Sequence, residues 1–132
     1  MTAMGACSRL SRASAAAPND ITARRFTEDC RRLGILIHGT FIVGLPGETP
    51  QTIRESIEFA KEMDCETIQV SLASPYPGTA FHDWVRQNGY AVVDPLVDEG
   101  GYQKCTVSYP AISADEIYAS VETFYKEFYF RP

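Results

Sequence analysis

Hydrophobic and polar residues follow a helical period in the first part of the chain. Phe26, Cys30 and Leu33 fall at positions i, i+4 and i+7, which predicts the buried face of a short helix. This helix is expected to begin near Asp20, a residue type suited to the N-cap, and to end at Gly34.

Two strands with a helix between them are expected next. The β-branched segment 35–43 predicts the first strand, and Thr67–Leu72 alternates between polar and apolar residues, which predicts the second. Thr49 and Pro50 suit the start of the intervening helix, because proline lacks only an N–H group that has no partner there. The buried stripe of this helix is expected to consist of Ile53, Ile57, Ala60 and Met63.

A further helix is expected after the loop SPYPGT at 74–79. Thr79 can cap this helix and Gly89 can end it. The apolar residues expected on it are Phe81, Trp84 and Val85. The segment 94–101 is predicted to be a loop, and 102–109 a strand or an extended arm.

The last helix has the strongest start signal in the chain. Ser113 and Glu116 fit a capping box, and Ile112 and Ile117 are spaced as its hydrophobic staple. The buried face is expected to consist of Ile117, Val121, Phe124 and Phe128.

This order of elements predicts an α/β fold with parallel strands and flanking helices. Each strand would reach the next by a right-handed crossover. The loops 44–49 and 73–79 would then lie at the same end of the sheet. Since ligands bind at that carboxyl end in parallel α/β folds, we expect a ligand site there.

Composition and charge restrict the class of protein. A chain of 132 residues can form one domain with a core, and its net charge of −5 offers no basic stripe to a nucleic acid. No run approaches the ~18 apolar residues that a membrane span requires. With no secretory signal in the sequence either, we expect a cytoplasmic protein.

Neither the first residues nor the cysteines are expected to form a functional site. Residues 1–18 are rich in Ala and Ser, and we expect a disordered or non-native leader, with an organelle transit peptide as the alternative. The ordered domain is expected over 19–132. The cysteines fit no metal or cluster spacing and are expected to be small core residues: Cys7, Cys30, Cys65 and Cys105.

The segment GLPGET at 44–49 is the first candidate for ligand binding. A glycine-rich turn that opens a helix can cradle a phosphate. Here the GKS or GKT ending of a P-loop and the GxGxxG spacing are both missing, and Glu48 adds a negative charge. A tight structural turn is favoured, and a small nucleotide-binding domain is the alternative.

A polar strand face is the second candidate. Thr67, Gln69 and Ser71 share one face of their strand, and we expect His38 and Thr40 to point inward beside them. A sheet covered on both sides would carry apolar residues there, so a polar face suits a barrel lumen that holds a cofactor or substrate. His38 either serves such a site or is hydrogen-bonded to a neighbour. No metal site and no catalytic nucleophile–base pair is expected.

Two motifs, FIVGLPGET at 41–49 and SPYPGT at 74–79, identify a family resemblance. The segment 21–89 resembles the second half of the radical S-adenosylmethionine domain. It is most similar to the subgroup that often carries a preceding cobalamin-binding domain, and especially to the hopanoid-biosynthesis-associated members. The resemblance implies the C-terminal portion of a partial (β/α)6 TIM-like barrel, with the strand ahead of GLPGET as its fifth.

The resemblance also implies positions in a site for S-adenosylmethionine. The implied cofactor-binding residues, acting largely through their backbone, are Phe41, Ile42, Val43, Gly44, Gly47, Glu48, Val70, Leu72 and Ala73. Among these, Glu48 would brace the loop. The candidates for the substrate side are His38, Thr40, Gln69, Ser71 and Tyr76.

The family cleaves S-adenosylmethionine reductively at a 4Fe–4S cluster held by CxxxCxxC, and this sequence contains no such motif. We therefore expect a truncated member that is inactive alone. Its full-length parent would hold the cluster, and cobalamin in some members. The expected substrate is a small molecule, with an isoprenoid lipid of hopanoid biosynthesis as the candidate.

A non-catalytic half-barrel that binds a partner supplying the missing strands is a further alternative. Without its neighbouring strand, the strand at 35–43 would keep an exposed apolar edge. This edge predicts marginal stability or self-association.

Overall fold

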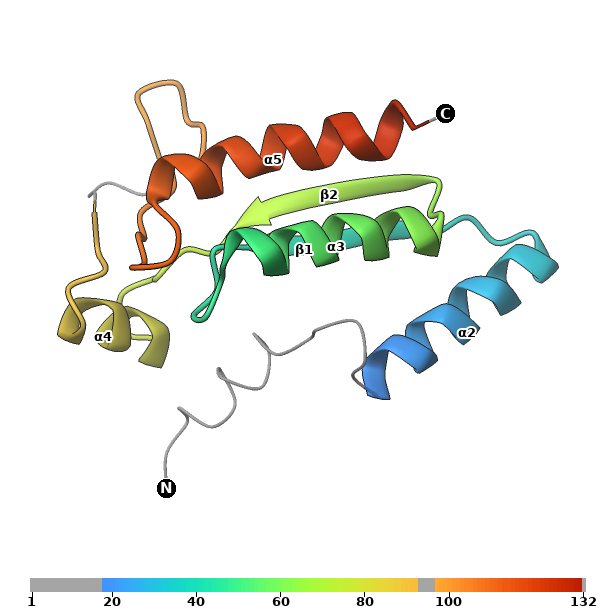
Figure 1. Ribbon diagram of the computed structural model, residues 1–132, viewed down its shortest axis with the longest axis horizontal. Coiled ribbons are helices and arrows are strands. Elements are labelled where there is room, and N and C mark those ends of the chain that lie inside the picture. Colours follow the sequence, from blue (N-terminus) through green and yellow to red (C-terminus); the bar gives the residue numbers. More distant parts are fainter. Residues whose placement is uncertain (1–17, 93–96, 132) are drawn as a thin grey trace.

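The computed structural model describes residues 18–92 and 97–131. The leader expected at 1–18 lies outside this part of the chain, except for Pro18, and so does Cys7. The described residues form four helices and one two-stranded sheet (Figure 1). In chain order, the elements are α2 (Pro18–Leu33), β1 (His38–Val43), α3 (Pro50–Met63), β2 (Thr67–Leu72), α4 (Ala80–Gln87) and α5 (Ala114–Tyr129).

The sheet consists of β1 and β2 in parallel, which confirms the predicted α/β arrangement. The register runs from His38 opposite Thr67 to Val43 opposite Leu72. The first strand begins at His38, so the strand predicted over 35–43 was too long. Its pairing partner β2 begins only at Thr67, and the residues before His38 have no strand beside them.

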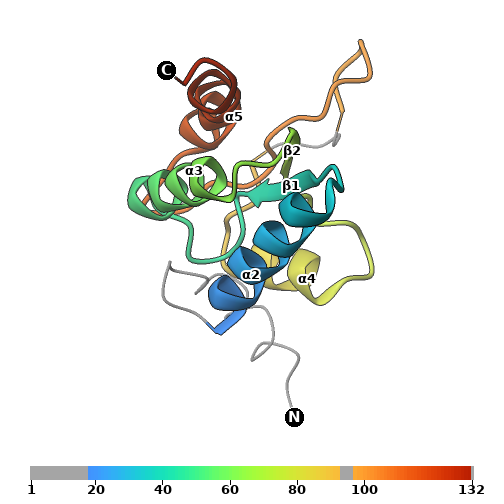
Figure 2. The same ribbon diagram turned by 90° about the vertical axis from the view of Figure 1, so that its right-hand side faces the viewer.

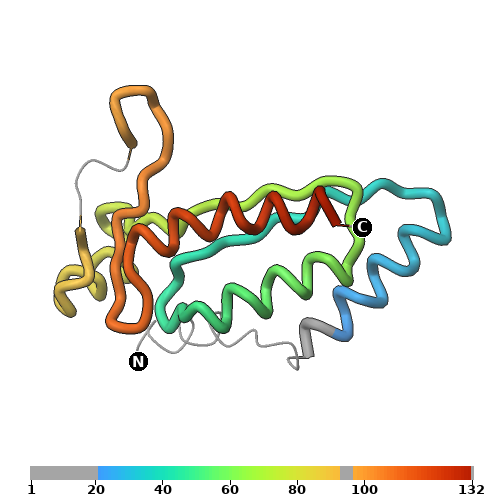
Figure 3. Tube along the Cα trace, turned by 45° about the horizontal axis from the view of Figure 1, so that its top comes forward, coloured from blue at the N-terminus to red at the C-terminus, as the bar shows by residue number. Residues whose placement is uncertain are grey.

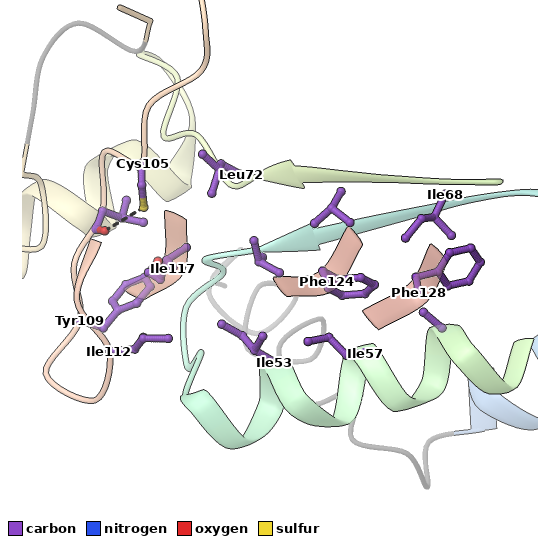
Figure 4. Packing of buried hydrophobic residues seen from close by; sticks show 14 of the residues in the cluster. Ile53, Ile57, Ile68, Leu72, Cys105, Tyr109, Ile112, Ile117, Phe124 and Phe128 are labelled. Carbon is purple, nitrogen blue, oxygen red and sulfur yellow. Dashed lines mark hydrogen bonds between the residues drawn. The ribbon is translucent and has the colours of Figure 1, made fainter. Parts of the chain in front are cut away.

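Helices α3 and α5 pack against each other and cover one face of the sheet (Figure 2). The predicted stripe of α3 is confirmed, since Ile53, Ile57, Ala60 and Met63 are all buried. From β2, the alternate residues Ile68, Val70 and Leu72 enter the same core, as expected. Figure 4 shows Phe124 and Phe128 of α5 between α3 and the strands.

The opposite face of the sheet carries the polar residues. His38, Thr40, Thr67 and Gln69 are exposed on it, and Ser71 is half-buried. This matches the expected polar face. The described residues contribute two strands to it, so they form neither a closed barrel nor a six-stranded one.

Helix α2 buries a different stripe from the predicted one. Cys30 is buried, but Phe26 and Leu33 are 60% and 69% exposed. The covered stripe instead contains Thr27, whose hydroxyl lies 3.9 Å from the Met63 sulfur at the end of α3. Helix α2 packs beside α3, and Phe26 and Leu33 lie on a flank that the described residues leave largely exposed.

The predicted starts of α3, α4 and α5 are confirmed, whereas α2 begins at Pro18 and contains Asp20, which was expected as its N-cap. Thr49 and Thr52 form a capping box on α3, and Ser113 and Glu116 form one on α5. Thr79 caps α4, its hydroxyl accepting from the His82 N–H at 3.2 Å. These caps satisfy N–H groups that the first helical turn leaves without partners.

The described residues 97–112, which precede α5, form an extended arm that folds back on itself (Figure 3). Isolated antiparallel bridges join Ala91 to Val107, Val97 to Gln103 and Tyr109 to Ile112. The segment 102–109 was predicted to be a strand or an extended arm, and it is part of an extended arm. No helix in the described part of the chain is long and apolar enough to cross a membrane.

Candidate functional site

The loops after β1 and β2 meet at the carboxyl end of the sheet. The Ala73 N–H donates to the Val43 carbonyl at 2.8 Å, which holds the two loops side by side. A pocket of about 530 Å³ opens here. It is lined by Ile42, Leu45, Ser71, Leu72, Ala73, Ser74, Tyr76, Phe81, Val97, Gly101 and Gln103.

Part of the implied site lies in this pocket. Its walls include Ile42, Leu72 and Ala73 from the implied cofactor positions, and Ser71 and Tyr76 from the substrate positions. The pocket therefore brings together residues from both strands and from SPYPGT. Its wall residues Ile42 and Ser71, for example, are 29 positions apart in the sequence. Apolar walls with a few polar groups suit a flat organic ligand.

Other implied residues lie outside the pocket. His38, Thr40 and Gln69 are exposed on the same sheet face, nearer the amino ends of the strands. The side chains that point into the helix-covered core, away from the pocket, are those of Phe41, Val43 and Val70. Phe41 packs on Phe124 of α5, with ring centroids 5.1 Å apart.

Gly44 is enclosed by the protein itself. Its φ is +88°, and an added Cβ would lie 3.2 Å from the Ile117 side chain. Its N–H donates to the Glu48 carboxylate at 3.1 Å, and its carbonyl accepts from the Tyr109 hydroxyl at 2.7 Å. Both backbone polar groups of Gly44 thus have hydrogen-bond partners within the chain. Glycine is needed here because φ is positive and because the Ile117 side chain leaves little room for a Cβ.

Glu48 ties the GLPGET loop to the start of α3. One carboxylate oxygen accepts from Gly44 and the other from the Thr52 hydroxyl. The Thr49 N–H donates to the Thr52 side chain, and the Thr52 N–H donates to the Thr49 side chain. Because these N–H groups already have partners and a carboxylate sits beside them, the geometry argues against a phosphate cradle at GLPGET.

Gln103 is a pocket residue that the sequence analysis missed. Its amide group donates to the Leu72 carbonyl at 2.8 Å and lies 2.6 Å from the Ser74 hydroxyl. These contacts fasten the arm to the end of β2, and Val97 and Gly101 of the arm form one pocket wall. No local motif marks Gln103, since its partners lie 29 and 31 residues away.

The turn of the arm is organised by Asp98. Its carboxylate accepts from the Gly100 N–H at 2.8 Å and from the Tyr102 N–H at 2.9 Å. The Asp98 N–H also donates to the Tyr102 carbonyl at 2.9 Å. An Asp two residues before a Gly-Gly pair is typical of a turn, so the sequence contains a local signal for this network.

An aromatic cluster of Trp84, Tyr90 and Tyr109 joins α4 to the arm. The ring centroids of Trp84 and Tyr90 are 5.4 Å apart, and those of Tyr90 and Tyr109 are 5.5 Å apart. Phe81, expected only as an apolar residue of this helix, faces the pocket. The cluster fixes α4 against the same tyrosine that bonds to Gly44.

His38 has a neighbour on the adjacent strand. Its Nδ1 lies 2.7 Å from the Thr67 hydroxyl, directly across the register. This is the hydrogen-bonded arrangement that the sequence analysis gave as one of two alternatives for this residue.

The described cysteines do not gather into a metal-binding group. Cys30, Cys65 and Cys105 are buried free thiols on separate elements or connections. Burial raises the pKa of the Cys65 and Cys105 thiols, which disfavours the thiolate form that binds metals. Within 18–92 and 97–131, no group of three His, Cys, Asp or Glu side chains is placed to hold a metal ion.

Comparison with known proteins gives partial matches. An uncharacterized methyltransferase of Pyrococcus horikoshii is 30% identical over 107 residues, which cover 77% of this chain and 22% of that protein. A bacteriochlorophyllide d C-8(2)-methyltransferase of Chlorobaculum tepidum is 29% identical over 70 residues, covering 53% of this chain and 16% of its own length. No protein-family model matches the chain.

A third relative transfers a related group. The probable threonylcarbamoyladenosine tRNA methylthiotransferase of Pyrococcus horikoshii is 36% identical over 56 residues, 42% of this chain and 13% of that protein. The relatives are methyl- and methylthiotransferases. This chain spans 22% or less of the length of each of these three proteins.

Proposed function

We propose that this chain is the adenosyl-binding part of a radical S-adenosylmethionine methyl- or methylthiotransferase barrel. The observation that carries the proposal is the meeting of FIVGLPGET and SPYPGT at one pocket, on the carboxyl side of two parallel strands. The methyl- and methylthiotransferase relatives support the use of S-adenosylmethionine.

The residues of the pocket fit the adenosyl group chemically. Ile42, Leu45 and Ala73 offer an apolar surface for a purine ring, and the Ser71 and Ser74 hydroxyls offer polar contacts at its rim. When bound, S-adenosylmethionine supplies a sulfonium centre whose carbon–sulfur bond can be broken. The chain's own contribution is to hold and orient that group and to exclude water from one side of it.

The described residues do not fit an iron–sulfur cluster. Their cysteines are buried apart from one another, and the sequence has no CxxxCxxC. The proposal therefore assigns adenosyl binding to this chain and assigns radical formation, with cobalamin where it is used, to the cluster-bearing part of a longer protein.

The substrate class follows less directly. The hopanoid or isoprenoid lipid assignment rests on the family resemblance, and the relatives' names give a bacteriochlorophyllide and a tRNA nucleoside instead. We propose that the substrate lies on the exposed sheet face beside the pocket, which carries His38, Thr40, Gln69 and Ser71, with Tyr76 in the loop after β2.

Calorimetric titration with S-adenosylmethionine and with adenosine tests the proposal. We expect saturable binding of both, and a loss of at least about tenfold in affinity for Ser71→Phe, because the ring fills the pocket. Gln51→Phe adds the same bulk at an exposed position on α3 and should bind as the wild type does. Matching urea midpoints would show that both variants fold.

Two results would overturn the proposal. One is the lack of saturable binding by the folded wild-type chain. The other is preferential binding of ATP with no effect of Ser71→Phe, which would favour the nucleotide-binding alternative.

A further inference from the structure

Gln103 fastens the arm to the end of β2 through the nitrogen of its side-chain amide. The Nε2 atom donates to the Leu72 carbonyl at 2.8 Å and lies 2.6 Å from the Ser74 hydroxyl oxygen. Because a carbonyl oxygen can only accept, the contact with Leu72 requires the nitrogen of the amide, and not its oxygen, on that side. Both N–H groups of the Gln103 side chain therefore have partners within the chain.

The oxygen of the same amide is left free to accept a hydrogen bond. Within residues 18–92 and 97–131, no N–H or O–H group donates to Gln103 Oε1. The Ser74 hydroxyl accepts from Nε2, and its own proton has no acceptor in this part of the chain. Since Oε1 and Nε2 are bonded to the same carbon, the free acceptor of Gln103 lies close to the free donor of Ser74.

This acceptor–donor pair belongs to the wall of the proposed adenosyl pocket. Gln103 and Ser74 both line the pocket and are both half-buried. The other walls include the apolar side chains of Ile42, Leu45 and Ala73. In a pocket with apolar walls, a few fixed polar groups determine which ligand binds and in which orientation. The pair is fixed in place by the contact of Gln103 with the Leu72 carbonyl.

We propose that Gln103 selects adenine as the base of the bound ligand by accepting a hydrogen bond from its amino group, beside a bond donated by the Ser74 hydroxyl to a ring nitrogen. This inference rests on the proposed adenosyl site and names the residue that determines its base specificity. Adenine carries its amino group between two ring nitrogens that accept hydrogen bonds. An acceptor beside a donor therefore matches either edge of this base.

Other purines do not offer the same pattern. Hypoxanthine carries a carbonyl where adenine carries its amino group, so two acceptors would face each other at Gln103. Unsubstituted purine lacks the amino group and would leave Gln103 Oε1 without a donor. A site that hydrogen-bonds a group of its ligand rejects an analogue lacking that group, because a polar atom of the site then stays unpaired.

Calorimetric titration of the full chain with adenosine, purine riboside and inosine tests this role. The wild type should bind adenosine at least about tenfold more tightly than purine riboside, and inosine more weakly than purine riboside. In Gln103→Met the acceptor is lost, and the ratio of the adenosine and purine riboside affinities should fall to within about twofold. A residue that only fastens the arm would weaken the binding of both ligands alike and leave this ratio unchanged.

Gln103→Lys is a second variant, because its ammonium group can still donate to the Leu72 carbonyl but cannot accept. It should also lose the preference for adenosine over purine riboside. Gln51→Met, at an exposed position on α3, is the matched control and should keep the wild-type ratio. Circular dichroism checks the fold of each variant.

Two kinds of result would overturn the inference. The role of Gln103 alone is overturned if the wild type binds adenosine without this preference, or if the preference survives in either folded variant. A folded wild type that binds no adenosine overturns the inference together with the proposed function.

Discussion

The hydroxyl of Tyr109 donates to the carbonyl of Gly44 at 2.7 Å, joining residues 65 positions apart. Tyr109 is buried and packs in the aromatic cluster with Trp84 and Tyr90. Gly44 begins the loop that the family resemblance places beside the ligand. The C-terminal arm therefore fixes the shape of a loop that belongs to the first strand.

Removing this hydroxyl should weaken the fold. In Tyr109→Phe, the buried Gly44 carbonyl loses its partner, and we expect unfolding free energy to fall by about 1–3 kcal/mol. Urea denaturation measures this loss. Tyr118→Phe, on the exposed side of α5, should change the stability by less than about 0.5 kcal/mol. Equal effects of the two changes would show that the Gly44 contact contributes nothing.

Gly44 itself should tolerate no side chain. Gly44→Ala meets both an unfavourable φ of +88° and the Ile117 side chain at 3.2 Å. The matched control is Gly78→Ala, where φ is +87° and no atom lies within 4 Å of the added Cβ. We expect Gly78→Ala to cost about 1–2 kcal/mol for the backbone conformation alone. Gly44→Ala should cost more in thermal or urea unfolding, and an equal cost would mean that Ile117 yields without penalty.

The capping box of α5 should make stability depend on acid pH. Hydrogen bonds from the Ser113 N–H and hydroxyl lower the pKa of Glu116 below its ordinary value of 4.5. A lowered folded-state pKa stabilises the protein above the unfolded value, and this contribution is lost as the pH falls through the folded value. Urea midpoints measured from pH 6 down to about pH 3 should therefore fall less steeply for Glu116→Gln than for the wild type.

The acid dependence has its own control in Ser113→Ala. This change removes both hydrogen bonds of the Ser113 hydroxyl, to the Glu116 carboxylate and from the Glu116 N–H, so its effect and that of Glu116→Gln should not add in the double variant. Full additivity at pH 6 would contradict a shared capping box. Ser113→Ala alone should cost about 1 kcal/mol.

The two tyrosines on the β2 edge should protect its amides. In Tyr125→Phe the Val70 N–H loses its acceptor, and in Tyr129→Phe the Ile68 N–H does. We expect hydrogen exchange of the corresponding amide to accelerate by about tenfold in each variant. Tyr118→Phe on the same helix should leave both rates unchanged. Unaltered exchange in all three variants would show that the two tyrosine hydrogen bonds do not limit exchange at these amides.

Local signals in the sequence were sufficient for most elements. The capping residues Thr49 and Ser113 and the alternation in Thr67–Leu72 each involve contacts within a few residues. The apolar stripe of α3 has a period set by the helix itself. For these features, the physics that forms the structure acts over one or two turns of chain, so the sequence could be interpreted directly.

The face of α2 shows where local reasoning ends. The apolar spacing of Phe26, Cys30 and Leu33 was correct for a helix, but the buried stripe depends on which neighbour is present. In the described structure that neighbour is α3, so Thr27 is covered and Phe26 is exposed. The predicted length of β1 was wrong for the same reason, since pairing with β2 decides where the strand begins.

The sequence by itself determined the parallel α/β order, and with it the end of the sheet where the two motifs meet. Only the tertiary structure decided which residues enclose that end. Gln103 closes the pocket wall and Tyr109 holds Gly44 through contacts that span 29 to 65 residues. No local period or capping residue predicts such contacts, because they depend on where the folded arm returns to the sheet.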